Sequence, residues 1–232
     1  MTFRYRNKNK STKKKTYKKT LGRRNAPQKN GPSNQVNMGL AYPKQSLVRH
    51  KYQDRYIMSS AGGALTHYGY SLNGMWDPKN AVGGNQPLYF DQLMAVYNHY
   101  TVIGAKMKVT VVPFDTNTVP CQIALWQNDD TTVTPSSFHV CSEQSKSQNR
   151  LLAEKNVKPT TLYLNWSAKK TFGGSVLSNV DLRGNAVSNP VDQSYGQISL
   201  QTVDSVTTSV VALIIDIEYS AIYTELRDMY GS

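Results

Sequence analysis

The stretch VVALIIDIEYSAIY (residues 210–223) alternates large apolar side chains with small or polar ones. One face receives Val211, Leu213, Ile215, Ile217 and Tyr219, and the other receives Ala212, Asp216, Glu218 and Ser220. A period of two is that of a β-strand, in which successive side chains point to opposite sides of the sheet. The stretch therefore predicts a strand with one buried face.

The same alternation recurs along the chain from about residue 54. KMKVTVV (106–112) places Met107, Val109 and Val111 on one face, TLYLNWSA (161–168) places Leu162, Leu164 and Trp166, and QISLQ (197–201) places Ile198 and Leu200. Further strand-like segments are RYIMSS (55–60), LTHYGYSL (65–72) and CQIALWQ (121–127). Clusters of Gly, Pro, Asn and Asp separate them, which is typical of loops. We expect seven or eight strands.

Two short segments have helical spacing instead. PLYFDQLMAVYNHY (87–100) begins with Pro and spaces Phe90, Leu93, Met94 and Tyr97 as on one face of a helix. SSFHVCSEQ (136–144) is compatible with a second turn or two. Many strands, long loops and one or two short helices predict an all-β protein, an antiparallel β-sandwich of the jelly-roll type.

Charge divides the chain into an arm and a body. The net charge is +12, from 27 basic and 15 acidic residues, but residues 1–53 hold fifteen of the bases and the first acid is Asp54. The remainder has a net charge of −3. We predict a basic N-terminal arm over residues 1–50 and a shell-like body over residues 51–232. Like charges and few apolar side chains predict that the arm alone is disordered.

Twelve bases lie within FRYRNKNKSTKKKTYKKTLGRRNAPQK (3–29), and we predict that they bind nucleic acid. They are Arg4, Arg6, Lys8, Lys10, Lys13, Lys14, Lys15, Lys18, Lys19, Arg23, Arg24 and Lys29. Each base that meets a phosphate releases counterions, so binding should be salt-dependent and independent of sequence. Phe3, Tyr5 and Tyr17 are interleaved and can stack on unpaired bases. The alternatives are a solvated tail or a nuclear localisation signal, and both are compatible with nucleic-acid binding.

Motifs of catalysis are lacking, so we predict neither an enzyme nor a cofactor. The sequence has no GxGxxG, P-loop, HExxH or GxSxG pattern, and His50, His67, His99 and His139 lie in four different segments. A zinc ion at His139 and Cys141 would need two more ligands, so a packed cysteine is the favoured interpretation and no metal is predicted.

Other candidate residues have simple structural interpretations beside the functional ones. Asp129 and Asp130 could bind calcium between subunits, but such a pair more often forms a turn. Trp166 shares its apolar face with Leu162 and Leu164, which favours the core over base stacking. Trp76 lies in a loop and could reach a subunit contact. The NWS sequon (165–167) lies mid-strand, and we treat it as chance.

The sequence predicts an intracellular location. Cys121 and Cys141 form neither a CxxC pair nor a disulfide framework. The longest apolar run, VVALII (210–215), is too short to span a bilayer, and lysines occupy the place of a signal peptide's apolar core. A cytosolic or nuclear protein without a membrane segment is expected.

Three blocks of sequence carry a family resemblance. QPLYFDQLMAVYNHYTVIGAKMKVTVVP (86–113) resembles the coat protein of circovirus-like viruses, which have circular single-stranded DNA and a replication-initiator gene. The matching positions are Pro87, Asp91, Gln92, Tyr97, Tyr100, Val102, Gly104 and Ala105. SEQSKSQNRLLAE (142–154) followed by LYLNWSAKKTFGG (162–174) resembles the family's polar Ser/Lys/Arg segment and the strand after it. NPVDQSYGQISLQ (189–201) with VVALIIDIEYSAIYTEL (210–226) resembles the family's two closing strands.

The resemblance implies a homo-oligomer of sixty copies in a closed icosahedral shell, with the arm inside on a single-stranded DNA genome. It also implies a virion location, and assembly in the host nucleus after contact with the nuclear import machinery. The arm departs from the family in having eight Lys and four Arg, which favours point-charge contacts over bidentate ones. Related jelly rolls occur in coats of small RNA viruses. An RNA-virus coat and a non-viral nucleic-acid-binding protein with a basic tail therefore stay open as alternatives.

Overall fold

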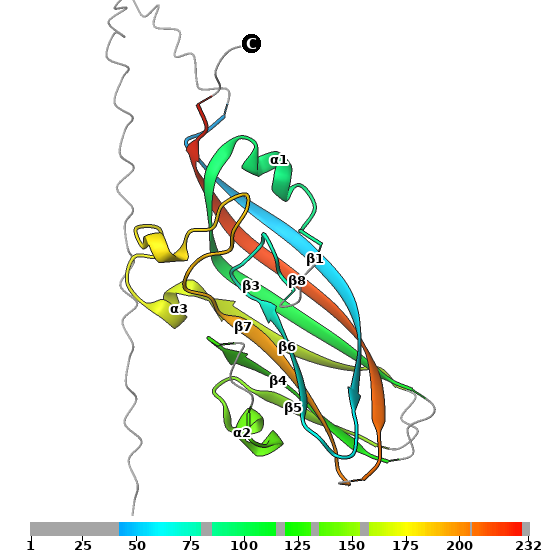
Figure 1. Ribbon diagram of the computed structural model, residues 1–232. Helices are drawn as coiled ribbons and strands as arrows, with labels where there is room; N and C mark the ends of the chain where they lie inside the picture. The colour runs from blue at the N-terminus through cyan, green and yellow to red at the C-terminus, as the bar shows by residue number, and fades with distance from the viewer. Residues whose placement is uncertain are drawn as a thin grey trace, which may run out of the picture. The chain divides into compact units, whose positions relative to one another are not determined.

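The computed structural model describes residues 42–79, 85–114, 119–130, 135–153, 158–204 and 206–228. All of the described residues belong to one compact unit, residues 39–232. In this unit eight strands form two four-stranded antiparallel sheets (Figure 1). The predicted arm up to residue 41, including its twelve bases, lies outside the described residues.

Each sheet takes its strands from distant parts of the chain. The first sheet has the order β1 (Gln45–Ser60), β8 (Ser209–Leu226), β3 (Tyr97–Pro113) and β6 (Thr160–Ser167). The second has the order β2 (Thr66–Ser71), β7 (Tyr195–Thr202), β4 (Cys121–Asn128) and β5 (Gln148–Leu152). β1 and β6 are therefore the edges of the first sheet, and β8 lies between two partners.

The strand pairing follows a single rule. β1 pairs with β8, β2 with β7, β3 with β6 and β4 with β5, as in one long antiparallel ribbon folded at the middle of the chain. Rolling that ribbon up adds the pairs β3 with β8 and β4 with β7 and gives two stacked sheets. Eight strands connected in this way form a jelly roll, so the predicted fold class is confirmed.

The core lies between the sheets and consists of the faces that alternation predicted. Val211, Leu213, Ile215, Ile217 and Tyr219 of β8 are all buried. The predicted inward residues of β3, β6 and β7, from Met107 to Leu200, are buried with them. Full burial of such a side chain contributes about 1.5–3 kcal/mol, which makes this alternating face the main determinant of the sandwich.

Both predicted helices exist, and the structure has more. α1 (Phe90–Met94) and α2 (Phe138–Glu143) fall inside the predicted segments. α1 ends early because β3 begins at Tyr97 and buries Tyr97 and Tyr100 in the core. α3 (Ala168–Phe172) and a 3-10 turn, η1 (Val180–Leu182), were not predicted. Among the described residues, no helix is both long enough and apolar enough to cross a membrane.

The start of β1 and the presence of β5 differ from the sequence-based expectation. β1 begins at Gln45, so residues 45–50 belong to the sandwich although the predicted arm ran to residue 50. Their pattern is weak because β1 is an edge strand whose outward residues are exposed. β5 was not predicted as a strand, since it is also an edge and buries only Leu152.

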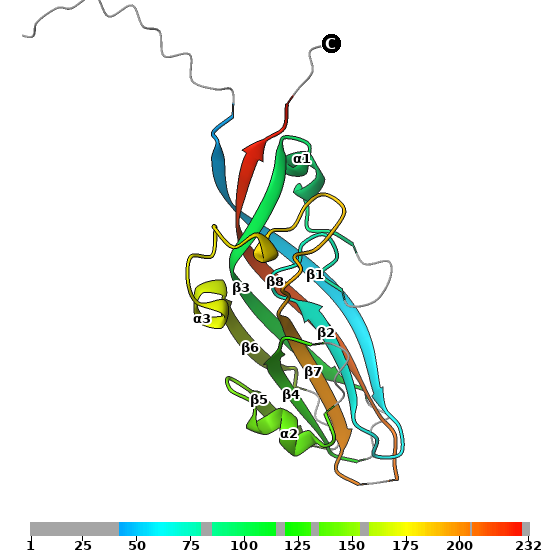
Figure 2. The same cartoon turned by 60° about the vertical axis from the view of Figure 1, so that its left-hand side comes forward.

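The second sheet is covered on its outer side by α2 (Figure 2). Phe138 and Cys141 of α2 pack against Ala124 and Trp126 of β4. The Trp126 Nε1–H donates to Ser199 Oγ at 2.9 Å. This cover explains why Ser199, and its neighbour Gln197, are buried although the alternation of β7 placed them on the polar face.

Candidate nucleic-acid interface

The twelve predicted nucleic-acid-binding bases, Arg4 to Lys29, lie outside the described residues, so their role stays a prediction. The structure describes the place where the chain enters the sandwich. The Tyr97 hydroxyl donates to the Pro43 carbonyl oxygen at 2.8 Å, and Tyr97 itself is buried. The last two residues before β1 are thereby fixed to the start of β3.

A buried histidine fastens β1 to its surroundings. His50 Nδ1 lies 3.0 Å from the Leu88 carbonyl oxygen, and His50 Nε2 lies 2.7 Å from the Tyr223 hydroxyl. A carbonyl only accepts, so Nδ1 carries the proton and Nε2 accepts from Tyr223. Burial lowers the pKa of His50, which favours this neutral form. The contact holds the segment before α1 against β1.

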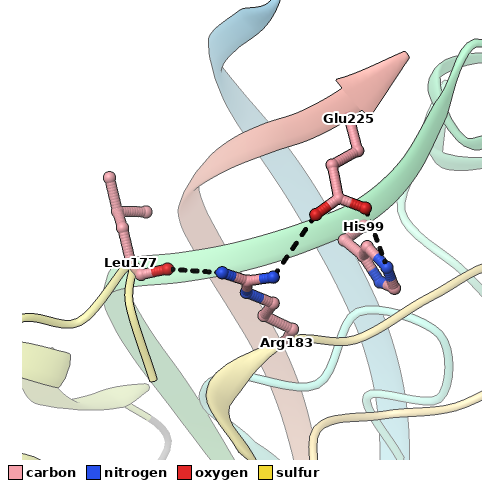
Figure 3. Close-up of polar contacts among 4 residues, drawn as sticks. All are labelled: His99, Leu177, Arg183 and Glu225. Atoms are coloured by element: carbon pink, nitrogen blue, oxygen red, sulfur yellow. Dashed lines mark hydrogen bonds and ion pairs between the residues drawn. The ribbon is translucent and has the colours of Figure 1, made fainter. Parts of the chain in front are cut away.

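A polar cluster lies at the start of β3 and the end of β8 (Figure 3). Glu225 Oε1 lies 3.4 Å from Arg183 Nη1, and Glu225 Oε2 lies 3.4 Å from His99 Nε2. Arg183 Nη2 donates to the Leu177 carbonyl oxygen at 3.1 Å. These residues join the end of β8, the start of β3 and the loop before η1. Leu177, Arg183 and Glu225 line a pocket of about 430 Å³. Lys44, which precedes β1, lines the same pocket.

The outer face of the first sheet collects positive charge. The described strands contain six Lys or Arg residues, and the only one outside this sheet is Arg150 of β5. The other five form what we call the basic sheet face: Arg49, Lys51, Arg55, Lys106 and Lys108. All five are exposed, and all alternate with inward residues of β1 and β3. A base-rich face on one sheet is an electrostatic footprint for a polyanion.

Most of these bases have no acidic partner. Lys108 Nζ lies 3.6 Å from Asp216 Oδ2, and Asp216 also accepts from Gln53 Nε2 at 2.7 Å. Within the described part of the chain, the ion pairs closer than 4.0 Å involve none of the other four bases of the basic sheet face. Glu218 is the other acid on this face, opposite both Lys51 and Lys106.

A groove of about 1050 Å³ runs over part of the basic sheet face. Its floor includes Lys51, Lys106 and Lys108, and its far wall is the segment 85–92 that leads into α1. Two tyrosines stand in it: Tyr163 of β6 is 54% exposed, and Tyr89 is 73% exposed. Basic side chains next to exposed rings are the combination that binds single-stranded nucleic acid.

The loops beside the start of β3 are held by one asparagine. Asn189 Oδ1 accepts from the backbone N–H groups of Trp76 and Asp77 at 3.1 and 3.2 Å and lies 3.3 Å from the Tyr100 hydroxyl. Gly184 crosses Tyr100 so closely that a Cβ would overlap the ring. Trp76, predicted as a loop residue with a subunit contact, lies in this loop and is 38% exposed. Its contact with another subunit stays a prediction.

The remaining candidates occupy simple structural positions. Trp166 is in the core, as predicted. Both cysteines are free. Cys121 lies inside the sandwich, and Cys141 lies on the side of α2 that packs against β4. Burial raises the pKa of each thiol. Asp129 is exposed just after β4. The described residues hold no group of three or more His, Cys, Asp or Glu side chains placed to share a metal ion.

The chain is similar to solved structures of viral coats. Tobacco necrosis virus is 13% identical over 79% of this chain and 97% of that chain, with a TM-score of 0.44. A particle of the giant freshwater prawn Macrobrachium rosenbergii nodavirus is 11% identical over 83% and 100%, with a TM-score of 0.43. The 60-mer BFDV capsid protein is 12% identical over 82% and 100%, also at 0.43. At such identities and TM-scores these similarities say nothing of function. No family model and no curated protein matches the chain.

The basic sheet face was not predicted from the sequence. KMKVTVV (106–112) shows Lys106 and Lys108 on the polar face of a strand, which is a partial signal. Arg49 and Lys51 belong to the run of bases that precedes the first acid, so their charge was attributed to that run and not to a strand. Their place on the same face as Lys106 and Lys108 follows only from the register of β1 with β8.

Proposed function

We propose that this protein is the coat protein of a small virus with a single-stranded circular DNA genome. Sixty copies of the jelly-roll body form a closed icosahedral shell, and the basic arm of each copy holds the genome inside. The protein has no catalytic role in this proposal. Its location is the virion, and its assembly takes place in the host nucleus.

The placement of charge is the observation that carries the proposal. Fifteen bases precede the first acid: thirteen of them lie on the chain that leads into β1 of a jelly roll, a fold used by viral capsid domains, and Arg49 and Lys51 lie on β1 itself. The rest of the chain has a net charge of −3, which lets subunits pack side by side without strong repulsion. Sixty such arms would bring about 900 positive charges to a genome.

The choice of DNA rests on the resemblance of residues 86–113 and the later strands to circovirus-like coats. A lysine-rich arm contacts phosphates, which DNA and RNA share, so an RNA-virus coat is the alternative. Nucleic acid recovered from particles made in infected cells, treated with DNase or RNase, separates the two. A cellular nucleic-acid-binding protein would instead stay monomeric or dimeric after purification.

Removal of the arm tests the packaging role. A variant lacking residues 1–30 should keep the fold of the body, because every residue of the buried core lies after residue 50. It should lose most of the nucleic acid that co-purifies with the full chain, measured by the ratio of absorbance at the nucleic-acid and protein maxima. A variant that retains a full load of nucleic acid would contradict the packaging role of the arm.

The nuclear location has its own test. KSTKKKTYKK (10–19) and GRR (22–24) should act as an import signal. Residues 1–30 fused to a fluorescent protein should concentrate in nuclei, and the same fusion with Gln in place of Lys13, Lys14, Lys15, Lys18 and Lys19 should not. An even distribution of the unmodified fusion would count against nuclear assembly.

A further inference from the structure

The run of bases that precedes the first acid extends onto the basic sheet face. Two of the fifteen bases that precede Asp54, Arg49 and Lys51, lie on the outward side of β1. Lys106 and Lys108 follow on the outward side of β3, two strand positions away across β8. A polyanion that leaves the arm therefore meets a cationic surface as soon as it reaches the body.

We propose that the basic sheet face and its groove form a second contact for single-stranded nucleic acid, with phosphates on Lys51, Lys106 and Lys108 and a base on Tyr163. The proposal rests on the packaging function given above. The basic sheet face differs from the arm because it is a folded surface. It would therefore hold one short stretch of the nucleic acid in a defined place.

The spacing of the bases suits an extended polynucleotide. Residues two apart on one face of a strand are separated by roughly 6.5 Å, comparable to the distance between successive phosphates of a stretched single strand. Arg49 and Lys51 have this spacing on β1, and Lys106 and Lys108 have it on β3.

The register places a stacking platform beside these charges. Lys108 is directly opposite Tyr163, and Lys106 is opposite Asn165. A base stacked on the Tyr163 ring would leave its phosphate within reach of a lysine, and the Asn165 amide could bond the edge of the base. Such stacking is tolerant of sequence, as packaging of a whole genome requires.

Positive charge is in excess on the basic sheet face as a whole, where its five bases stand against two acids, Asp216 and Glu218. The groove itself is balanced, because its three lysines lie among Asp91, Asp216 and Glu218. The excess comes from Arg49 and Arg55, which lie on β1 on either side of the groove-lining residues 51–53 and have no ion pair in the described structure. A ligand that extends beyond the groove along β1 meets this positive charge, which favours a polyanion over a second copy of the near-neutral body.

The wall of the groove is held in a costly conformation. Tyr89 has φ 67, in the left-handed region that a bulky side chain rarely adopts. This conformation keeps Tyr89 and Leu88 exposed over the groove, while the contact of His50 with the Leu88 carbonyl fixes the backbone. Strain of this kind is retained where it positions residues for a ligand.

The test uses the full chain with two charge-matched double variants. K51Q/K106Q removes two bases of the basic sheet face, and the control K146Q/R150Q removes two exposed bases outside it. Binding of fluorescent oligothymidylate is measured by anisotropy over a range of salt concentrations. The slope of log affinity against log salt should fall by about 0.7 for each phosphate that is no longer bound, hence by about 1.4 in K51Q/K106Q, and should stay at the wild-type value in the control.

A second measurement locates the strand directly. Ultraviolet crosslinking of the full chain to oligothymidylate or oligouridylate, followed by peptide mapping, should give crosslinks to the peptide containing Tyr163 as well as to the arm. Crosslinks confined to the arm, or equal salt slopes in the two double variants, would overturn the proposal while leaving the packaging function intact. A K51Q/K106Q variant that assembles poorly with an unchanged slope would make the face a subunit contact and also overturn it. Failure of the wild-type chain to bind any single strand would instead remove the proposed function itself.

Discussion

His50 shows how one buried side chain can organise the entry of the chain into the sandwich. It contacts the Leu88 carbonyl before α1 and the Tyr223 hydroxyl on β8. The sequence marked it only as one of four scattered histidines, because its role depends on the pairing of β1 with β8. Its neutral form satisfies both partners, so its titration should matter for stability.

The stability of the body should fall in mild acid because of this residue. Burial lowers the pKa of His50 from its usual 6.5, so below pH 6.5 the unfolded chain takes up a proton that the folded chain still excludes. The contribution of His50 to the free energy of unfolding is fully present above pH 6.5. It decreases as the pH falls from 6.5 toward the pKa of His50 in the folded state. Urea denaturation at pH values on both sides of 6.5 measures this loss.

The variant H50Q keeps a donor and an acceptor but does not titrate, so it should lose less stability than the wild type over the same pH interval. The control H139Q, at an exposed position of α2, should follow the wild type. Identical pH profiles for the wild type and H50Q would show that His50 does not contribute to the acid sensitivity.

At the scale of elements, the strands with a clear apolar alternation were predictable, including the edge strands β2 and β6, whereas β5 and the start of β1 were not. β8 and β3 are flanked by partners and bury one whole face, so their side chains follow a strict period of two. β5 and the first part of β1 are edges with charged or polar outward residues, and their pattern merges with that of the polar segments around them. α3, with the sequence AKKTF, lacks the preceding Pro and the spaced apolar residues that marked the segment of α1.

The loops that meet at Asn189 should behave as one element. Asn189 accepts from Trp76 and Asp77, and its Nδ2–H donates to the Asp77 carbonyl oxygen at 2.9 Å. In N189A these backbone groups lose their partner, at a cost of about 1–3 kcal/mol in the free energy of unfolding. Denaturant unfolding measures the loss, and limited proteolysis should show faster cleavage near Trp76.

The matched control is N149A, at an exposed position of the edge strand β5, which should change stability by less than about 0.5 kcal/mol. Equal stabilities of N189A and N149A would mean that the loops do not depend on the Asn189 bridge.

At the scale of the whole molecule, the sequence indicated the basic arm but not the basic sheet face. The twelve arm bases stand together in the chain, so their role as a polyanion-binding site could be predicted without a fold. The basic sheet face is assembled from two strands more than fifty residues apart, Lys51 on β1 and Lys106 on β3, and only the strand order brings them to one side. The linear sequence gives only a partial signal for this surface, the two lysines on the polar face of KMKVTVV (106–112).

In the proposed shell, the division between a charged arm and a near-neutral body should also govern assembly. Fifteen bases per subunit repel one another when many subunits converge, whereas the contacts between bodies should be short-range packing with some hydrogen bonds. Nucleic acid neutralises the arms and should therefore promote closure. Because the arm reads phosphates and not base edges, single strands of any sequence should serve.

Negative-stain electron microscopy of the purified full chain at low salt, with and without single-stranded DNA of random sequence, tests the central claim most directly. We predict uniform closed shells when DNA is present and few without it. Shells that form equally well without any polyanion would show that the charge of the arm does not control closure. Subunits that stay monomeric or dimeric with DNA would contradict the assignment of this chain as a coat protein.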